Sequence, residues 1–258
     1  MPKLVFITGA SSGLGQALAL RFYRAGYTLA LCARRVNDLQ SWVDTQRLSQ
    51  DRYRIYSADV AVSSSIIGAG HACLSDLGTP DVVIANAGIS IGMDSSVQSD
   101  LDVMARTLTT NLVGVASTFH PFLLAMKKRG SGRLVGIGSV AGIRGLPGHG
   151  AYCASKAGVI SYCESLRGEL RSSGVKVVTI CPGYIDTPLT QKNTYSMPFL
   201  MSPEAFSDKA FETIERGTSY RVIPWQMGVV AKLLRILPNV LLDKSLAGRA
   251  RKARSTDG

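Results

Sequence analysis

Three polar residues in the middle of the chain, Ser139, Tyr152 and Lys156, have types and spacing that suit acid-base chemistry. Tyr152 and Lys156 are four residues apart in a segment of helical periodicity, so their side chains share one helix face. Ser139 ends an apolar run and can reach that face across the loop that follows it. A phenol has a pKa near 10, and an ammonium about 4 Å away stabilises its ionised form by about 4 kcal/mol at an effective dielectric constant of about 20. We therefore expect Lys156 to lower the pKa of Tyr152, and Tyr152 to act as a general acid or base.

A glycine-rich turn near the N-terminus indicates a dinucleotide site. The apolar run 4–8 leads into Thr8-Gly9-Ala10-Ser11-Ser12-Gly13-Leu14-Gly15 and then into the helical segment 14–25. Glycines at a strand-to-helix turn let backbone amides approach a pyrophosphate at the helix N-terminus. The spacing is Gly-x-x-x-Gly-x-Gly rather than Gly-x-Gly-x-x-Gly, so an ordinary glycine-rich turn is the alternative.

Arg34 and Arg35 directly follow the second apolar run, 28–33. An acidic residue at this place would bind a ribose 2′-hydroxyl and repel a 2′-phosphate, whereas a guanidinium forms paired hydrogen bonds with a phosphate. The two arginines therefore favour NADP(H) over NAD(H), the alternative being two arginines at a solvated helix start.

The elements that must position these residues alternate along the chain. Short apolar runs at 4–8, 28–33, 53–57, 82–86, 133–138, 175–181 and 220–223 predict strands, and helical periodicity between them includes the long segment 101–128. The strands are apolar on both faces, as in a parallel sheet that helices cover on both sides. We predict a single-domain α/β fold, a doubly wound, Rossmann-like sheet of about seven parallel strands.

The composition excludes several classes of protein. With 46% hydrophobic and 18% charged residues over 258 positions, the chain is not disordered. No apolar stretch approaches the roughly 18 residues of a membrane-spanning helix. The net charge of +11 is compatible with nucleic acid, an anionic membrane surface or an anionic ligand. Because the basic residues are not interleaved with aromatic stacking groups, we expect no nucleic-acid partner.

The cysteines and histidines suggest neither a disulfide framework nor a metal site. The five cysteines are an odd number without a Cys-x-x-Cys pair, and no histidine lies at zinc-ligand spacing. We expect no metal ligands and a reducing compartment, hence a cytoplasmic location. Cys153 is interpreted as a packing residue, and His149 as a structural residue that could line the substrate entrance.

Further motifs make the chain resemble the short-chain dehydrogenase/reductase family of the Tyr-x-x-x-Lys type, over roughly residues 3–225. The glycine-rich turn resembles the family's cofactor motif, Asp59-Val60 its adenine contact and Asn86-Ala87-Gly88 its central-sheet motif. Asn111 resembles its helix asparagine, and Pro182-Gly183-Tyr184-Ile185-Asp186-Thr187 its nicotinamide-holding segment. Singly, the asparagines could be buried structural amides and Asp59 a helix cap.

The resemblance implies a role for each site residue. Tyr152 would be the general acid or base, Ser139 would hold the substrate oxygen, and Lys156 would bind the nicotinamide ribose and lower the pKa of Tyr152. Asn111 would support a proton relay through water, which completes the catalytic set. The predicted cofactor-binding residues are Gly9, Ser11, Ser12, Gly13, Leu14, Gly15, Arg34, Arg35, Asp59, Val60, Asn86, Ala87, Gly88, Tyr152, Lys156, Pro182, Gly183, Ile185 and Thr187.

Two segments fall outside the alternation of strands and helices. We interpret residues 184–217, which include an apolar stretch from Met197 to Phe206, as a lid over the substrate or as packing on the sheet edge. Residues 226–258 form a basic amphipathic extension, with apolar residues from Met227 to Leu237 at helical spacing. This extension could contact an anionic membrane peripherally, or it could cover the pocket or a subunit interface.

These observations together predict an NADPH-dependent, reversible reduction of a carbonyl group on a lipophilic substrate. The family resemblance implies a homodimer or homotetramer. The alternatives are an NAD-linked alcohol dehydrogenase and a non-catalytic NADP-binding sensor or membrane-docked scaffold.

Overall fold

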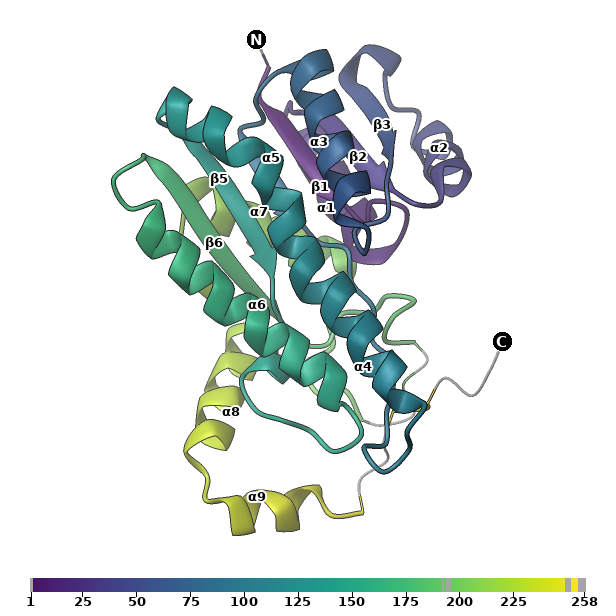
Figure 1. The fold of residues 1–258 in the computed structure, drawn as a ribbon, viewed down its shortest axis with the longest axis vertical. Helices are drawn as coiled ribbons and strands as arrows, with labels where there is room; N and C mark the ends of the chain where they lie inside the picture. The colour runs from purple at the N-terminus through teal and green to yellow at the C-terminus, as the bar shows by residue number, and fades with distance from the viewer. Residues whose placement is uncertain (1, 192, 194–195, 249–251, 255–258) are drawn as a thin grey trace.

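A seven-stranded parallel sheet with helices on both faces forms the protein (Figure 1). The computed structural model describes residues 2–191, 193, 196–248 and 252–254. The strand order is β3-β2-β1-β4-β5-β6-β7, so the chain builds outward from β1 to β3 and then resumes on the other side of β1 with β4. The predicted doubly wound, Rossmann-like fold is confirmed.

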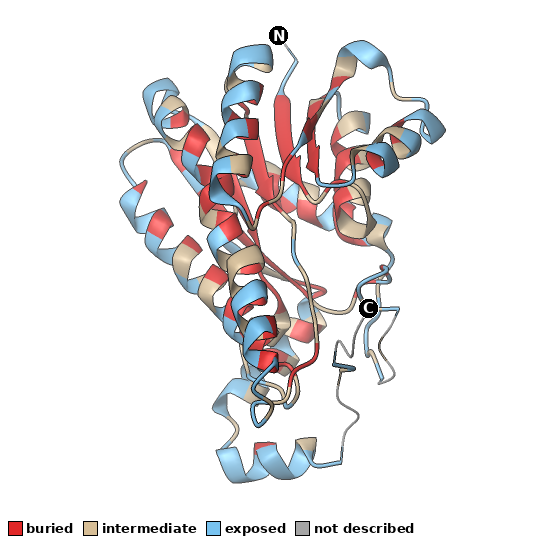
Figure 2. Ribbon diagram, turned by 45° about the vertical axis from the view of Figure 1, so that its right-hand side comes forward, coloured by how far each residue is buried: buried red, intermediate tan, exposed pale blue. Residues whose placement is uncertain are grey.

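The strands coincide closely with the apolar runs of the sequence. They are β1 (Leu4–Thr8), β2 (Thr28–Ala33), β3 (Tyr53–Ser57), β4 (Val82–Ala85), β5 (Gly132–Ile137), β6 (Val175–Pro182) and β7 (Tyr220–Ile223). Successive side chains alternate between the faces, so that Val5 and Ile7 enter one core and Leu4 and Phe6 the other. Both faces are buried, which explains why the runs are apolar without alternation (Figure 2).

Two layers of helices cover the sheet. One face packs against α1 (Gly13–Arg24), α2 (Val36–Thr45) and α7 (Pro203–Arg216). The other packs against α3 (Ser63–Leu77), α5 (Gly114–Arg129) and α6 (Gly150–Glu169). The remaining helices are α4 (Asp100–Leu108), which leads toward α5, and α8 (Trp225–Ile236) and α9 (Asn239–Leu246), which follow β7 beyond the sheet (Figure 1).

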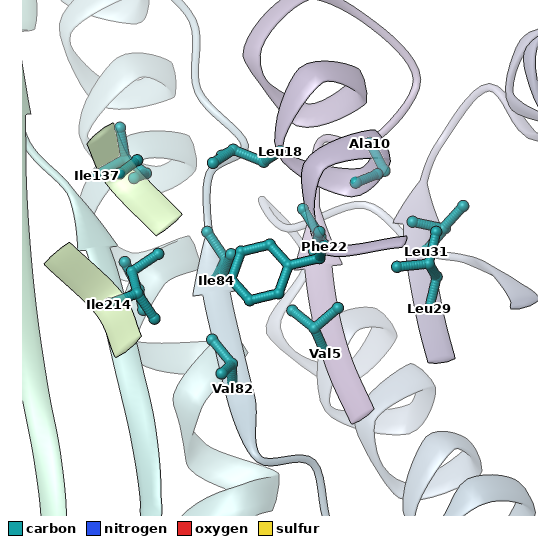
Figure 3. Close-up of a cluster of buried hydrophobic side chains, with 14 of the residues drawn as sticks. Val5, Ala10, Leu18, Phe22, Leu29, Leu31, Val82, Ile84, Ile137 and Ile214 are labelled. Atoms are coloured by element: carbon teal, nitrogen blue, oxygen red, sulfur yellow. The ribbon is translucent and has the colours of Figure 1, made fainter. Parts of the chain in front are cut away.

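The core on the first face fixes the helix whose first turn borders the site. Phe22 of α1 is fully buried among the sheet residues Val5 and Ile84, with Leu18 one turn earlier (Figure 3). Burying a side chain of this size contributes about 1.5–3 kcal/mol. The N-terminus of α1 is thereby held at the end of β1.

The predicted single helix over 101–128 is interrupted in the structure. A π-helical turn, η2 (Thr109–Val113), separates α4 from α5 and contains the buried Asn111. Such turns add a residue to the helix and re-aim a side chain, often at functional sites, and they leave the apolar periodicity nearly unchanged. This is why the sequence pattern alone did not reveal it.

Part of the predicted lid is core. Phe206, at the start of α7, is fully buried with Ala210 and Ile214 against the sheet, which corrects the expectation that Phe206 belongs to a covering segment. Earlier in the segment, Ile185 forms an isolated bridge with Met201, which brings these two positions together. The lid itself remains a prediction.

The C-terminal helix α8 packs on the protein through part of the side predicted to contact either a membrane or protein. Met227 and Ala231 of α8 are buried, whereas Trp225, Leu233 and Ile236 are exposed. Arg249 and Arg251 of the predicted basic tail lie outside the described residues. Within the described ranges, every helix is too short or insufficiently apolar to cross a bilayer.

Candidate active site

A cleft of about 570 Å³ opens at the carboxyl edge of the sheet. It lies where β1 and β4 adjoin and the strand order reverses, the usual place for ligands in doubly wound sheets. The predicted site residues that line it are Gly9, Ser11, Ser12, Gly13, Leu14, Arg34, Arg35, Asp59, Val60, Asn86, Ala87, Gly88, Ser139, Tyr152, Lys156, Pro182, Gly183, Ile185 and Thr187. Gly15 and Asn111 do not line the cleft and are buried behind its wall.

The glycine turn after β1 is joined to the end of β4. Gly9 has a φ of +67°, and a Cβ at this position would lie 2.8 Å from the Cα of Ala87. The Asn86 side-chain amide donates to the Thr8 carbonyl at 3.0 Å, and the Asn86 backbone amide donates to the Thr8 hydroxyl at 3.1 Å. A Cβ on Gly15 would collide with the Gly9 carbonyl, so Gly15 allows α1 to begin directly behind the turn.

The start of α1 has the properties of an anion site. Ser11, Ser12 and Gly13 line the cleft, and the first helical turn from Gly13 to Gln16 carries no charged side chain. The first amides of a helix lack helical acceptors and carry partial positive charge, which stabilises a phosphate group. The closely packed glycine cradle and this helix start fit the pyrophosphate of a dinucleotide.

Arg34 and Arg35 line the same cleft beyond the end of β2. Both side chains are about two-thirds exposed: Arg34 lies 3.5 Å from the Asp59 carboxylate and Arg35 lies 2.8 Å from that of Asp38. Exposed pairs of this kind are weak, so either guanidinium can exchange its partner for a phosphate. Asp59 also accepts a hydrogen bond from the Ala61 amide at 2.9 Å, as a turn-stabilising residue does.

The segment after β6 forms the opposite wall. The Gly183 amide donates to the Ile223 carbonyl at 2.8 Å, which continues the pairing with β7. Thr187 faces the glycine turn, since a Cβ on Gly13 would lie 3.3 Å from the Thr187 side chain. The two walls therefore approach each other at the glycine turn.

Ser139, Tyr152 and Lys156 meet at one end of the cleft. Ser139 follows β5, and its hydroxyl accepts from the Ala141 amide at 3.1 Å and hydrogen-bonds to Tyr152. The Lys156 ammonium lies 5.8 Å from the centre of the Tyr152 ring and donates to the Ile137 carbonyl at 2.8 Å. Tyr152 is partly exposed to the cleft, while Lys156 is buried behind it.

Burial moves the pKa values of Tyr152 and Lys156 in opposite directions. Desolvation raises the pKa of the Tyr152 phenol to about 12, although the hydrogen bond with Ser139 lowers it. Desolvation also lowers the pKa of the Lys156 ammonium to about 8. The predicted net lowering of the Tyr152 pKa is not found, because the cost of desolvating a phenolate is the largest effect on this group. At neutral pH Tyr152 is therefore a proton donor beside a mostly protonated lysine.

Asn111 holds the site from behind. Its side-chain oxygen accepts from the Ile89 amide at 2.8 Å, and its side-chain nitrogen donates to the Ile89 carbonyl at 2.9 Å and to the Ser155 hydroxyl at 3.0 Å. Asn111 thereby joins the loop after β4 to the helix that carries Tyr152 and Lys156. We describe it as a positioning residue, since it does not reach the cleft surface.

Several lining residues were not singled out from the sequence. Ile89, Ser90 and Ile91 directly follow the Asn86-Ala87-Gly88 motif, which could have indicated them. Leu189 and Lys252 also line the cleft, and no local pattern placed Lys252 there. His149 is buried at the start of α6 and is not part of the lining, and all five cysteines are buried free thiols.

This architecture coincides with a known family. A family model described as short chain dehydrogenase matches residues 3–197, most of the chain. The chain belongs to the short-chain dehydrogenase/reductase family. An uncharacterised oxidoreductase of Myxococcus xanthus (strain DK1622) is 36% identical over 241 residues, which cover 93% of this chain and 95% of the relative. The resemblance on which the sequence interpretation rested is confirmed.

Solved structures of other proteins share the fold of this short-chain dehydrogenase/reductase. An alcohol dehydrogenase from Thermococcus sibiricus, in complex with 5-hydroxy-NADP, has a TM-score of 0.76 and 25% identity, covering 86% of this chain and 95% of that one. A 3-ketoacyl-(acyl-carrier-protein) reductase from Brucella melitensis, in complex with NADH, has a TM-score of 0.78 and 22% identity, covering 86% and 96%. The protein is thus an oxidoreductase whose fold binds a nicotinamide dinucleotide.

Proposed function

We propose that this short-chain dehydrogenase/reductase catalyses the reversible, NADP(H)-dependent reduction of a carbonyl group to an alcohol. One arrangement carries the proposal: a phenol, a hydroxyl and an ammonium converge at one end of a single cleft, and two exposed arginines lie farther along it. The roles predicted for Ser139, Tyr152 and Lys156 remain part of this proposal, whereas we propose a positioning role for Asn111 in place of the predicted proton relay.

The residues of the site divide the work of the reaction. The nicotinamide dinucleotide, when bound, supplies hydride to the carbonyl carbon. The Ser139 hydroxyl orients the substrate oxygen, and Tyr152 donates its phenolic proton to that oxygen. Lys156 stabilises the phenolate that Tyr152 then becomes, because its ammonium lies in a desolvated site where charges interact strongly. Asn111 holds the loop at Ile89 next to α6 through hydrogen bonds to Ile89 and Ser155.

The preference for NADP(H) rests on Arg34 and Arg35. Two guanidinium groups at the end of β2 suit a 2′-phosphate. The contact between Arg34 and Asp59 favours the runner-up, an NAD-linked alcohol dehydrogenase, because Asp59 partly neutralises that guanidinium. The two solved neighbours hold one nucleotide of each kind and do not decide between them.

A lipophilic substrate is supported by the apolar side chains of Ile91 and Leu189, which line the cleft. The test is oxidation of NADPH and of NADH, followed by absorbance, with a panel of ketones of graded hydrophobicity. Reduction of apolar ketones with NADPH supports the proposal. Binding of NADPH without turnover of any ketone would support the non-catalytic sensor instead.

The proposal also covers the oligomeric state of the protein and its location in the cell. We infer a homodimer or homotetramer from the family resemblance, and a cytoplasmic protein from five buried free thiols, which suit a reducing compartment. We also keep peripheral membrane contact as a proposal for α8 and α9. The exposed side chains of Trp225, Leu233, Ile236 and Val240 support it.

A further inference from the structure

A short piece of the C-terminal tail, residues 252–254, returns to the cleft and docks beside it. The Gly92 amide donates to the Ala253 carbonyl at 3.1 Å, and Gly92 forms an isolated parallel bridge with Arg254. A Cβ on Gly92 would collide with the carbonyls of Lys252 and Ala253, so the tail approaches closely only because this residue is glycine. The tail thus adds to the loop that follows β4 and lines the cleft at Ile91.

A paired ionic contact anchors the tail. The Arg254 guanidinium donates to both carboxylate oxygens of Asp100, at 2.7 and 3.0 Å, and the Asp100 side chain is only 7% exposed. Bidentate arginine–carboxylate pairs fix orientation as well as distance. The hydrogen bond from Arg254 also holds the pKa of Asp100 below its usual value. Arg254 therefore fixes where Lys252, two residues earlier, enters the cleft.

Lys252 lies at the catalytic end of the cleft. Its ammonium donates to the Leu189 carbonyl at 3.3 Å, and the residue lines the cleft with Leu189 and Ile91. Its charge also helps to lower the pKa of the buried His149, which precedes Tyr152 by three residues, although burial is the larger cause. The tail thus brings a cation to the end of the cleft that holds Tyr152.

Charge is distributed unevenly over the cleft. Among the described residues that line it, Asp59 is the one carboxylate, and it lies beside Arg34 at the distant end. The tail brings Lys252 to this lining beside the Leu189 carbonyl, which accepts a hydrogen bond from its ammonium, and next to the loop that contains Ile91. A cation in a partly enclosed cleft attracts anions more strongly than one in open water.

We propose that the C-terminal tail holds Lys252 at the substrate end of the cleft so that its ammonium binds an anionic group, a carboxylate or a phosphate, of the carbonyl substrate. The inference rests on the proposed function, and it narrows the substrate class to an apolar carbonyl compound with an acidic group. The phosphates of the nucleotide are the other source of such an anion, and the experiment separates the two.

The test compares 4-acetylbenzoate with its methyl ester, two ketones that differ in one negative charge. With saturating NADPH, the parent protein should show the lower KM for the carboxylate. Lys252→Met should raise that KM about ten- to a hundred-fold, with less than about a threefold change for the ester or in kcat. Lys252→Arg, which keeps the charge, should restore most of the preference. Lys244→Met, which removes an exposed charge from α9, is the matched control and should change neither KM.

Three results would overturn the inference. They are equal KM values of the parent for acid and ester, an equal rise of both in Lys252→Met, and a loss of NADPH affinity in Lys252→Met with both KM values unchanged. The last result would assign Lys252 to the nucleotide phosphates. If neither ketone is reduced, the proposed function fails for this pair of ketones. Calorimetric affinities of both compounds for the NADPH-saturated parent and for Lys252→Met then test whether Lys252 binds the carboxylate. Arg254→Ala should reproduce the carboxylate-specific loss by releasing the tail.

Discussion

The ammonium of Lys156 donates a hydrogen bond to the backbone carbonyl of Ile137, with 2.8 Å between the two atoms. Ile137 is the last residue of β5 and precedes Ser139 by two positions. The bond therefore fixes α6, which carries Tyr152, against the strand that presents Ser139. It also keeps the ammonium 5.8 Å from the centre of the Tyr152 ring, where its charge acts through a desolvated interior.

The lowered pKa of Lys156 predicts the pH dependence of carbonyl reduction. With a pKa of about 8, the ammonium is charged below pH 8 and loses its charge above it. The raised pKa of Tyr152, about 12, keeps the phenol protonated over this whole range. We expect kcat/KM for NADPH, measured at low NADPH concentration, to be constant below about pH 8 and to fall about tenfold per pH unit above it. Lys156→Arg, which stays charged, should lack this fall if it is active, and a rate that rises through pH 8 would contradict the prediction.

Removal of the phenolic hydroxyl should abolish turnover and spare nucleotide binding. Tyr152→Phe leaves the ring in place but removes the proton donor, which should lower kcat by about 10²–10⁴-fold. The dissociation constant for NADPH, measured by fluorescence, should change by less than about threefold. Tyr162→Phe on the same helix is the control, because that ring packs against Phe119 outside the cleft. A Tyr152→Phe variant with the parent's rate would show that another group donates the proton.

The two arginines at the end of β2 should set nucleotide preference. Loss of a guanidinium–phosphate contact costs about 1.5–3 kcal/mol, so Arg34→Ala and Arg35→Ala should each weaken NADPH binding about ten- to a hundred-fold. NADH affinity should change little, which titration of both nucleotides will measure. Arg24→Ala, at the far end of α1, is the control. Equal weakening of both nucleotides, or a parent that prefers NADH, would favour the NAD-linked alternative.

Asn111 should contribute to stability as well as to the position of the site. Asn111→Ala removes three hydrogen bonds, two with the partly buried backbone of Ile89 and one with the Ser155 hydroxyl, and each contributes about 0.5–1.5 kcal/mol. We expect urea unfolding to show a loss of about 2–4 kcal/mol. Val113→Ala, a partly exposed position in the same π-helical turn, should cost less than about 1 kcal/mol. Similar stabilities of the two variants would contradict the role assigned to Asn111.

Most of the fold was predictable because its signals are local. Each strand is a short apolar run, and the bounds of β1, β2, β3 and β7 agree with the predicted ranges. β4 and β6 differ by one residue at their C-terminal ends and β5 by one residue at each end, since a terminal residue can pair or not without any change of composition. The glycine turn was predictable because its motif is local, and the contact of Gly15 with the Gly9 carbonyl lies within the turn, whereas the contact of Gly9 with Ala87 is a distant one.

The features that were missed depend on distant contacts. Within the π-helical turn, the Asn111 side chain hydrogen-bonds to Ile89 and Ser155, which lie 22 and 44 residues away. Phe206 has the composition of a lid residue, and only its packing against the sheet makes it core. Lys252 enters the cleft because Arg254 reaches Asp100 across 154 residues, a pairing that no periodicity encodes.

The exposed apolar side of α8 and α9 leads to the last prediction. Ile236 and Val240 are each 78% exposed, and the exposed basic residues Lys232, Arg235 and Lys244 lie on the same two helices. If these helices contact an anionic membrane, each basic group contributes about 1 kcal/mol, and salt screens that contribution. The full chain should then sediment with phosphatidylserine vesicles at low salt and much less at high salt.

Point variants separate membrane contact from packing better than a truncation would, because Met227 and Ala231 of α8 are buried and removal of the helix would expose the core. The double variant Ile236→Ser and Val240→Ser should lose most of the sedimentation while keeping the parent's unfolding midpoint. Leu124→Ser, which changes a 79% exposed leucine on α5, should behave as the parent. An anionic membrane would bind the basic groups through its charge and the apolar side chains through its lipid core. If the parent shows no salt-sensitive sedimentation, we infer instead that α8 and α9 form a subunit contact. Gel filtration of the double variant would then show a smaller assembly than the parent.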